Sequence, residues 1–291
     1  MTKVLITGAD GQLGKSLKKC SHQKKDHFLF TNSKELDICD PLSIRTVLSS
    51  FKPDYIINCA AYTAVDKAEE DKTKAFLVNR DGVINLIKES ASFKSKIIHI
   101  STDYVFSGNA KHPYKEDDEL DPQSVYGHSK AEGEKALIEL AASRSMIIRT
   151  SWLYSEFGHN FIKTMLRLGA EKESINVVND QLGTPTYASD LANAILMIID
   201  KNISFGKHSN LLHFSNSGLT NWYEFAIAIM KFSDLNCKVN PIPTSSYPTA
   251  AMRPAYSELN CQKIEGLLNY KIRDWKIALK ECLFEINLEA K

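Results

Sequence analysis

The chain opens with Lys3-Val-Leu-Ile-Thr7, which runs directly into Gly8-Ala-Asp-Gly11-Gln-Leu-Gly14. The first segment is a short apolar run with β-branched residues, typical of a buried parallel strand. The three glycines predict a tight turn that lets the backbone approach a pyrophosphate, and the helix expected after them turns its free N–H groups towards that anion. Strand, glycine turn and helix in this order indicate a dinucleotide-binding βα unit, although a plain βα turn has the same pattern.

Strands and helices alternate along most of the chain. A helix opens at Pro41, with Asp40 as a suitable N-cap. The alternation predicts an α/β fold of Rossmann type, a doubly wound parallel sheet with right-handed crossovers. The later strands are expected at residues 28–31, 54–61, 96–101, 145–150 and 175–178, the last as a sixth strand, and further helices at 65–77, 81–92, 126–142, 161–168, 190–199, 222–232 and 274–286.

Two domains are expected from this pattern. Residues 1–150, with about 171–200, form the predicted dinucleotide-binding Rossmann domain. Residues of about 151–170 and 201–291 form a smaller C-terminal substrate lobe over the carboxyl edge of the sheet. No linker rich in glycine, serine or proline marks the boundary.

The composition fits a soluble enzyme, and the scattered cysteines favour a reducing cytoplasm. Lys and Arg number 36 and Asp and Glu 35, with no basic stripe or polybasic cluster, so neither nucleic acid nor a membrane surface is an expected partner. No apolar run has the length of a membrane span, and no signal peptide is expected. The six cysteines are scattered without metal-ligand spacing, which predicts free thiols and no metal site.

A tyrosine and a lysine four residues apart, Tyr126 and Lys130, lie in a stretch expected to be helical. This spacing places them one turn apart on one helix face. A cation beside a phenol favours the phenolate and lowers its pKa from about 10, so the pair predicts the proton donor that carbonyl reduction needs. The same five-residue pattern also marks ordinary exposed helix starts.

Ser101-Thr102-Asp103 stands at the end of the strand expected at 96–101. Ligands of open parallel sheets bind at the carboxyl ends of the strands. A hydroxyl group here is therefore expected to hydrogen-bond a substrate carbonyl and to help orient Tyr126, or else only to cap the next turn.

Longer strings carry a family resemblance. The glycine turn, Ala60-Ala61, Asn79, the strand-end hydroxyls and YxxxK together resemble an extended short-chain dehydrogenase/reductase. The chain further resembles the dTDP-4-dehydrorhamnose reductase family, and more narrowly its spore-coat polysaccharide branch, from residue 4 to about residue 260. The strings that carry this are Ala61-Tyr-Thr-Ala-Val-Asp-Lys-Ala-Glu69, Ser101-Thr-Asp-Tyr-Val-Phe106, Arg149-Thr-Ser-Trp-Leu-Tyr154, Asp180-Gln-Leu-Gly-Thr-Pro-Thr186 and Arg253-Pro-Ala-Tyr-Ser257.

The resemblance implies reduction of the C4 ketone of dTDP-4-dehydro-β-L-rhamnose to dTDP-β-L-rhamnose, for rhamnose-containing surface polysaccharide. It implies that Tyr126 donates the proton, that Lys130 lowers its pKa and binds the nicotinamide ribose, and that Thr102 binds the carbonyl oxygen. The implied substrate residues are Thr102, Asp103, Tyr104, Trp152 and, as a diphosphate clamp, Arg253. The implied cofactor residues are Gly8, Gly11, Gln12, Leu13 and Gly14 at the pyrophosphate, Asp37 and Ile38 at the adenine end, Ala60, Ala61 and Tyr62 at the ribose and nicotinamide, and again Tyr126 and Lys130.

Plainer roles stay open for some of these residues. Trp152 also suits the core, Asp37 a turn cap before Pro41, and Arg253 a surface cation, while Cys59 is expected only to pack.

Two departures from the family pattern bear on partner and cofactor. Some members carry a glutamate two residues after the third glycine, where it helps to bind a magnesium ion between subunits. The chain has Ser16 there, which argues against a magnesium-bridged dimer and for a monomer. The second expected strand ends without an acidic residue for a ribose 2′-hydroxyl, and Lys34 is available for a 2′-phosphate, so NADPH is expected, with NADH as the alternative.

Three functions are compatible with these patterns. The first is the nucleotide-sugar ketoreductase. The second is an epimerase or dehydratase of the extended family, which would keep its NAD and show no net oxidation. The third is a non-catalytic regulatory subunit resembling that of methionine adenosyltransferase, against which the intact Thr102, Tyr126 and Lys130 argue.

Overall fold

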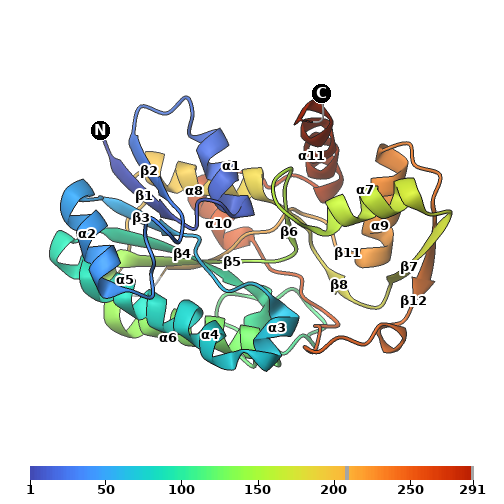
Figure 1. Cartoon of the computed structure of the whole chain (residues 1–291), viewed down its shortest axis with the longest axis horizontal. Helices are drawn as coiled ribbons and strands as arrows, with labels where there is room; N and C mark the ends of the chain where they lie inside the picture. Colours follow the sequence, from blue (N-terminus) through green and yellow to red (C-terminus); the bar gives the residue numbers. More distant parts are fainter. Residues whose placement is uncertain (207–209, 290–291) are drawn as a thin grey trace.

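A parallel sheet dominates the computed structural model, which describes residues 1–206 and 210–289 (Figure 1). All neighbouring strands of this sheet run parallel. This confirms the expected α/β class and places the strand ends that carry the glycine turn and Thr102 at one edge. The order across the described sheet is β2 (His27–Thr31), β1 (Lys3–Thr7), β3 (Tyr55–Asn58), β4 (Lys96–Thr102), β5 (Ser145–Thr150) and β10 (Asn210–His213).

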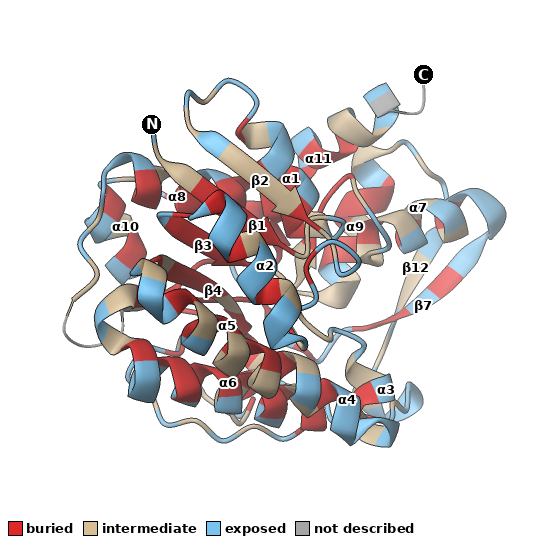
Figure 2. Cartoon of the chain, turned by 60° about the vertical axis from the view of Figure 1, so that its left-hand side comes forward, coloured by how far each residue is buried: buried red, intermediate tan, exposed pale blue. Residues whose placement is uncertain are grey.

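Helices cover both faces of the sheet, and the strands supply alternate side chains to the two layers. Val4 and Ile6 of β1 face one layer, whereas Leu5 between them faces the other. Figure 2 shows the resulting buried interior of the sheet beneath exposed outer helix faces. The first layer contains α1 (Gln12–Cys20), α8 (Ala188–Asp200) and α10 (Gln262–Leu268); the second contains α2 (Pro41–Phe51), α5 (Gly82–Ser90) and α6 (Val125–Ala141).

The connection from β3 to α5 is more broken than the two helices expected there. It consists of α3 (Val65–Glu70), α4 (Lys72–Phe76) and a π-helical turn (Leu77–Asp81) that continues into α5. The predicted cap of α2 is confirmed, because the Asp40 side chain accepts a hydrogen bond from the backbone N of Leu42. Short 3-10 turns lie at Ala91–Phe93, Asp103–Val105, Ala142–Arg144 and Thr244–Ser246.

A smaller lobe stands beside the carboxyl edge of the sheet, on the right in Figure 1. Its apolar core is built from α7 (Phe161–Glu171), α9 (Trp222–Phe232), α11 (Trp275–Glu289) and the parallel pair β7 (Ser174–Val178) and β12 (Lys238–Ile242). Two small pairs, β6 (Leu153–Tyr154) with β9 (Thr186–Tyr187) and β8 (Leu182–Gly183) with β11 (Thr220–Asn221), lead into it.

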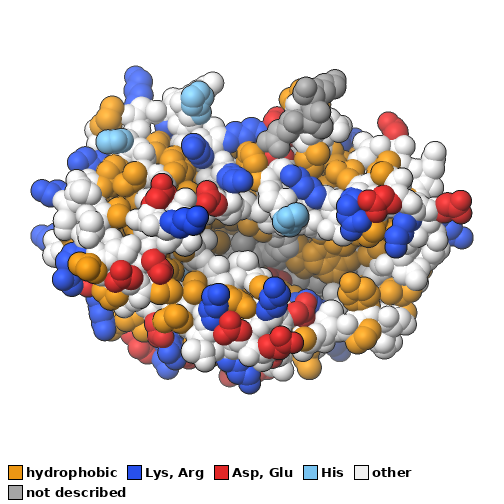
Figure 3. All heavy atoms as spheres, in the orientation of Figure 1, with side chains coloured by type: hydrophobic (Ala, Val, Ile, Leu, Met, Phe, Trp, Pro, Cys, Tyr) orange, Lys and Arg blue, Asp and Glu red, His pale blue; other side chains and the backbone are white. Residues whose placement is uncertain are grey.

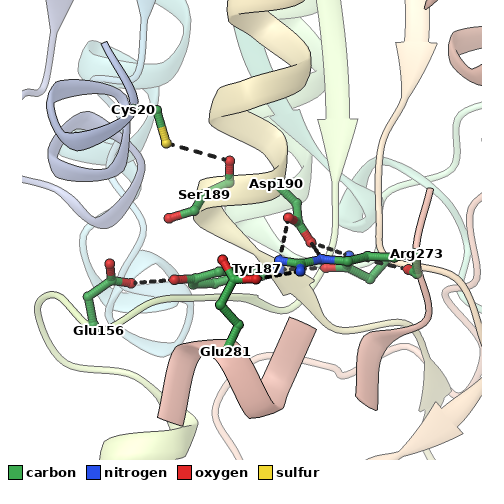
Figure 4. A network of polar contacts seen from close by, with 8 residues as sticks. Cys20, Glu156, Tyr187, Ser189, Asp190, Arg273 and Glu281 are labelled. Carbon is green, nitrogen blue, oxygen red and sulfur yellow. Dashed lines mark hydrogen bonds and ion pairs between the residues drawn. The ribbon is translucent and has the colours of Figure 1, made fainter. Parts of the chain in front are cut away.

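Polar contacts join the lobe to α8 of the sheet part (Figure 4). Arg273 Nη2 donates to Asp190 Oδ1 at 2.7 Å, and Arg273 Nη1 pairs with Glu281 of α11 at 2.5 Å. Nearby, the Tyr187 hydroxyl donates to Glu156 Oε2 at 3.1 Å. These contacts fix the last helix of the lobe relative to the sheet. No helix in the described part of the chain is long and apolar enough to cross a membrane.

A strand is present at the expected residues 175–178, but it is not part of the large sheet. Residues 175–178 belong to β7, which pairs with β12 in the lobe, whereas β10 pairs with β5 and completes the large sheet. β7, expected in the Rossmann domain, thus packs in the lobe, whereas β10 and α10, expected in the lobe, pack with the large sheet. Ser174 and Asn176 of β7 are exposed, which is typical of a strand with one solvated face, whereas the central strands of a parallel sheet are buried on both faces.

Candidate functional site

The carboxyl ends of β1, β3 and β4 form the edge at which the expected site residues gather. The chain runs from β1 to β2 on one side and continues with β3 on the other, so the strand order switches between β1 and β3. Open α/β sheets bind ligands in the crevice at such a switch point. Figure 3 shows a hollow between the sheet part, at left, and the lobe, at right, with hydrophobic side chains gathered on its right-hand wall.

The glycine turn after β1 is packed so closely that two of its glycines admit no side chain. Gly8 has φ +65°, and a Cβ there would lie 2.7 Å from the backbone N of Ala60. A Cβ on Gly14 would lie 2.6 Å from the carbonyl oxygen of Gly8. Gly11 caps α1 without a side-chain hydrogen bond, so N–H groups of the first turn remain for an anion. This cradle fits the pyrophosphate of a dinucleotide.

The side chains of Gln12 and Leu13, the next expected cofactor residues, contact other parts of the protein. Gln12 Oε1 accepts hydrogen bonds from Asn160 Nδ2 at 2.9 Å and from Ser155 Oγ at 3.1 Å. Leu13 is buried in the core. Both residues would therefore meet a pyrophosphate through their backbone, and Gln12 also ties the glycine turn to the segment that leads into the lobe.

The loop Ala60-Ala61-Tyr62 leaves β3 beside the glycine turn and is held by Asn79. Asn79 Oδ1 accepts a hydrogen bond from the backbone N of Tyr62, and Asn79 Nδ2 donates to Ser129 Oγ, both at 2.9 Å. Asn79 is buried within the π-helical turn, a distortion frequent at functional sites. The amide thus fixes the expected nicotinamide loop to α6, the helix that carries the YxxxK pair.

Tyr126 lies in the first turn of α6 against Tyr104, with ring centroids 5.6 Å apart and planes at 73°. Ser124 caps this helix by accepting a hydrogen bond from the backbone N of Gly127 at 3.1 Å. Burial raises the pKa of Tyr126 well above its ordinary value, which the hydroxyl of Thr102 partly offsets. The phenol is therefore protonated at neutral pH and holds a proton that it can donate.

Lys130 is held by strand β4 rather than by the phenol. Its Nζ donates to the carbonyl oxygen of Ile100 at 2.6 Å and lies 3.2 Å from His99 Nε2. Burial lowers the pKa of Lys130 to about 8, against the attraction of Glu134. In this structure the ammonium is engaged by β4 and burial dominates the pKa of Tyr126, so the expectation that Lys130 lowers that pKa stays a prediction for the complex with cofactor and substrate.

Asp103 is a buried carboxyl group beside Thr102. Its Oδ1 accepts a hydrogen bond from Thr102 Oγ1 at 3.0 Å, whereas its Oδ2 has no partner in the part of the chain that the structure describes. Burial raises the pKa of Asp103 to about 7, and the hydrogen bond from Thr102 together with the nearby hydroxyl of Ser257 offsets part of this rise. An unpartnered carboxyl oxygen at the end of β4 is suited to bind a polar group of a ligand.

Arg253 lies close to the tyrosine pair and is no isolated surface cation. Its Nη2 pairs with Asp66 Oδ2 at 2.5 Å, and its Nη1 donates to Tyr104 Oη at 3.3 Å. Asp66 also accepts a hydrogen bond from the backbone N of Ala251 at 3.1 Å. The loop that carries Arg253 is thus tied to α3, with a guanidinium group at the edge of the site.

Trp152 stacks on Trp222 of α9, with ring centroids 3.7 Å apart and planes at 10°. It has φ +46°, a left-handed conformation that is strained for a bulky residue. A Cβ on Gly183 would lie 2.7 Å from the Trp152 ring, so the absence of a side chain at Gly183 makes room for it. Trp152 is half-buried and belongs to an aromatic stack that faces the lobe, which leaves part of the ring for a ligand.

Asp37 and Ile38 lie in the turn before α2. Asp37 Oδ1 accepts a hydrogen bond from the backbone N of Cys39 at 2.9 Å, which is the turn-capping role left open above. Ile38 is buried in the core between the sheet and α2. Asp37 is exposed and Ile38 is buried, so contacts to an adenine would come from Asp37 or from the backbone of this turn.

Four residues of the site had no role in the sequence analysis: Asn58, His99, Asp66 and Trp222. Asn58 ends the apolar strand β3 and His99 lies within β4. Burial of a polar side chain in such a strand is costly, and this cost could have marked both residues as functional from the sequence. Asp66 and Trp222 carried no such signal. Their contacts join segments that folding brings together.

Comparison with known proteins gives the same family over almost the whole length. The family model described as "RmlD substrate binding domain" matches residues 1–288. The spore coat polysaccharide biosynthesis protein SpsK of Bacillus subtilis is 43% identical over 285 residues, which covers 98% of each chain. A dTDP-4-dehydrorhamnose reductase of Aggregatibacter actinomycetemcomitans is 42% identical, covering 96% of this chain and 98% of that protein.

A crystal structure of the dTDP-4-dehydrorhamnose reductase of Bacillus anthracis, in complex with NADP, superposes with a TM-score of 0.92. It is 37% identical to this chain, covering 98% of this chain and 99% of that one. The match therefore includes the large sheet and the lobe together.

Proposed function

The chain belongs to the dTDP-4-dehydrorhamnose reductase family, characterised by the RmlD substrate binding domain, and from that premise we propose that it is such a reductase. It reduces the C4 ketone of dTDP-4-dehydro-β-L-rhamnose to give dTDP-β-L-rhamnose. The 43% identity to the spore coat polysaccharide biosynthesis protein of Bacillus subtilis supports a role in rhamnose-containing surface polysaccharide. The six free cysteines are in keeping with a reducing cytoplasm as its location.

The observation that carries this proposal is the convergence of three chain segments on one sheet edge. The glycine turn of β1 and α1 cradles a pyrophosphate, the end of β4 presents Thr102, and the first turn of α6 presents Tyr126. NADPH supplies the hydride when it is bound. The bound NADP of the Bacillus anthracis relative supports this cofactor, and NADH is the alternative.

Three residues of the chain act on the ketone in this proposal. Thr102 hydrogen-bonds the carbonyl oxygen, and Tyr126 donates its proton to that oxygen as negative charge develops there. Because burial raises the pKa of Tyr126, the phenol holds its proton at neutral pH and needs a nearby cation to release it. Lys130 is that cation: with a pKa of about 8 it is charged at neutral pH.

The substrate's sugar lies in this proposal between Tyr104, Asp103 and Trp152. Arg253 binds the diphosphate, which competes with Asp66 for its guanidinium group. Arg253 also donates to the hydroxyl of Tyr104, whose ring packs on Tyr126. A phosphate bound by Arg253 is therefore linked through Tyr104 to the proposed proton donor.

Two further proposals concern cofactor preference and assembly. The backbone N of Lys34 donates to Asn32 Oδ1 at 2.9 Å, so the turn after β2 carries an exposed lysine available to a 2′-phosphate. Ser16 is completely buried within α1, where it cannot reach a metal ion shared with another subunit. We therefore propose NADPH as the preferred cofactor and a monomer rather than a magnesium-bridged dimer.

The test is loss of reduced-nicotinamide absorbance when the purified protein is mixed with NADPH or NADH and dTDP-4-dehydro-L-rhamnose made in situ by upstream enzymes. Sugar-dependent oxidation with dTDP-rhamnose as the product is expected, faster with NADPH. Binding of either cofactor without oxidation would refute the reductase and direct attention to an epimerase of the wider family or to a regulatory subunit. Co-purification with a partner enzyme would favour the regulatory subunit.

A further inference from the structure

Three buried polar side chains form a row beneath α6 that leads to Lys130. Thr7, Asn58 and His99 are register neighbours on β1, β3 and β4, so their side chains lie side by side on one face of the sheet. Thr7 Oγ1 lies 2.6 Å from Asn58 Oδ1, and Asn58 Nδ2 lies 3.0 Å from His99 Nδ1. His99 Nε2 in turn lies 3.2 Å from Lys130 Nζ. Of these four residues, the proposed chemistry so far uses only Lys130.

His99 is a neutral imidazole, and each of its two ring nitrogens has a polar partner. It has no exposed surface, and its pKa is lowered well below the ordinary value by burial and by the charge of Lys130. A buried polar ring inside an apolar strand is costly unless both nitrogens find partners, and both do. Because a neutral imidazole donates at one nitrogen and accepts at the other, the partner of Nδ1 decides what Nε2 can do for Lys130.

The ammonium of Lys130 has three hydrogens and a limited set of neighbours. One hydrogen bonds the carbonyl oxygen of Ile100, and a second faces His99 Nε2. The third is left for the side of the site where the cofactor ribose is proposed to bind. With two of its three bonds directed to β4, the direction of the remaining N–H is fixed.

The charged and titratable neighbours of Lys130 do not replace His99. Glu134, one turn further along α6, is paired with Arg149, whose Nη2 lies 2.6 Å and Nε 2.9 Å from its two oxygens. The thiol of Cys59 after β3 has its pKa raised to about 12 by burial and is neutral at pH 7. Neither group forms a hydrogen bond with Lys130 in the described part of the chain.

We propose that His99 is a positioning residue for Lys130: it accepts a hydrogen bond from the ammonium at Nε2 and thereby directs the remaining N–H, while Asn58 selects the imidazole tautomer. Acceptance at Nε2 requires the ring proton on Nδ1, where it is donated to the side-chain oxygen of Asn58. The amide offers that oxygen after a half-turn about its last torsion, and the hydroxyl of Thr7 can serve either orientation because it both donates and accepts. The proposal rests on the proposed reductase function.

The test uses two amide variants that differ in reach. In His99→Gln the amide oxygen extends to about the place of Nε2 and can still accept from Lys130. In His99→Asn the shorter amide keeps the contact with Asn58 but does not reach Lys130. Loss of a hydrogen bond to a charged group corresponds to about a tenfold to hundredfold effect, so kcat at pH 7 is expected to fall by that factor in His99→Asn and to be largely restored in His99→Gln.

The pH profile distinguishes positioning from a merely structural role. Lys130 is charged below its pKa of about 8, and removal of an acceptor disfavours the ammonium and lowers that pKa. The alkaline limb of kcat therefore moves to lower pH in His99→Asn and stays near the wild-type position in His99→Gln. Equal limbs in both folded variants and the wild type would overturn the proposal.

NADPH affinity across the same pH range, followed by cofactor fluorescence, supplies a readout that does not need turnover. If wild-type protein binds NADPH but does not oxidise it, the reductase function fails while the positioning of Lys130 is still tested by this binding profile. A shifted limb for His99→Asn alone supports the proposal, and superimposable binding profiles refute it.

Discussion

Replacement of Gly133 by alanine should destabilise the protein although alanine is the better helix former. Gly133 lies within α6 against the π-helical turn, and a Cβ there would stand 2.2 Å from the carbonyl oxygen of Asn79. That oxygen belongs to the backbone and cannot rotate away. An alanine gains about 1 kcal/mol of helix propensity over glycine, whereas overpacking in a filled core costs about 1–3 kcal/mol or more.

Because the clash at Gly133 is with the backbone, its cost should lie at about 2–3 kcal/mol, so the net loss for Gly133→Ala is expected at about 1–2 kcal/mol, with a Tm lowered by about 2–4 °C for each kcal/mol. The displaced turn carries Asn79, whose amide holds Tyr62 and Ser129, so the affinity for NADPH should fall as well. Thermal unfolding and fluorescence titration with NADPH measure the two effects.

Gly266 provides the matched control. It also lies in a helix, α10, but a Cβ there would meet no heavy atom within 4 Å. Gly266→Ala should therefore raise the stability by up to about 1 kcal/mol and leave NADPH affinity unchanged. The reasoning would be refuted by a Gly133→Ala protein that unfolds at or above the wild-type temperature, with Gly266→Ala behaving in the same way.

Three other changes have expected outcomes. Tyr126→Phe should abolish sugar-dependent NADPH oxidation but retain NADPH binding, and normal turnover would eliminate the phenol as proton donor. Arg253→Met should raise the KM for the dTDP-sugar more than it lowers kcat, as measured by steady-state kinetics. Asp66→Asn removes an ion pair of Arg253 whose carboxylate is half-exposed, so it should change the free energy of unfolding in urea by no more than about 1 kcal/mol. Glu134→Gln should cost about 3–5 kcal/mol in urea unfolding, because it leaves the buried guanidinium of Arg149 without its carboxylate, and an unchanged midpoint would contradict this.

Local patterns in the sequence were sufficient for the fold class and for much of the site. The apolar run before Gly8, the glycine spacing and the strand-end hydroxyl of Thr102 each lie within a few consecutive residues. Parallel strands bring their carboxyl ends to one edge whatever the details of packing, so residues that end different strands meet there. The position of Tyr126 one turn before Lys130 likewise follows from helix geometry alone.

Contacts between distant segments were decided only by the tertiary structure. The residues of β10 and β7 both have strand character, and the sequence did not show which of them pairs with β5 in the large sheet. The pairing of Arg253 with Asp66 spans 187 positions. Such partners leave no periodic signal, because their meeting depends on how whole layers pack.

The environment of Lys130 was likewise decided by contacts between distant segments. The sequence places the lysine near the tyrosine, but the ammonium is held by Ile100 and His99 of β4, thirty or more residues away. Burial in that setting raises the pKa of Tyr126 and lowers that of Lys130. Sequence spacing determines which residues are neighbours along a helix, whereas the desolvation and hydrogen bonds that set their protonation come from the surrounding strands.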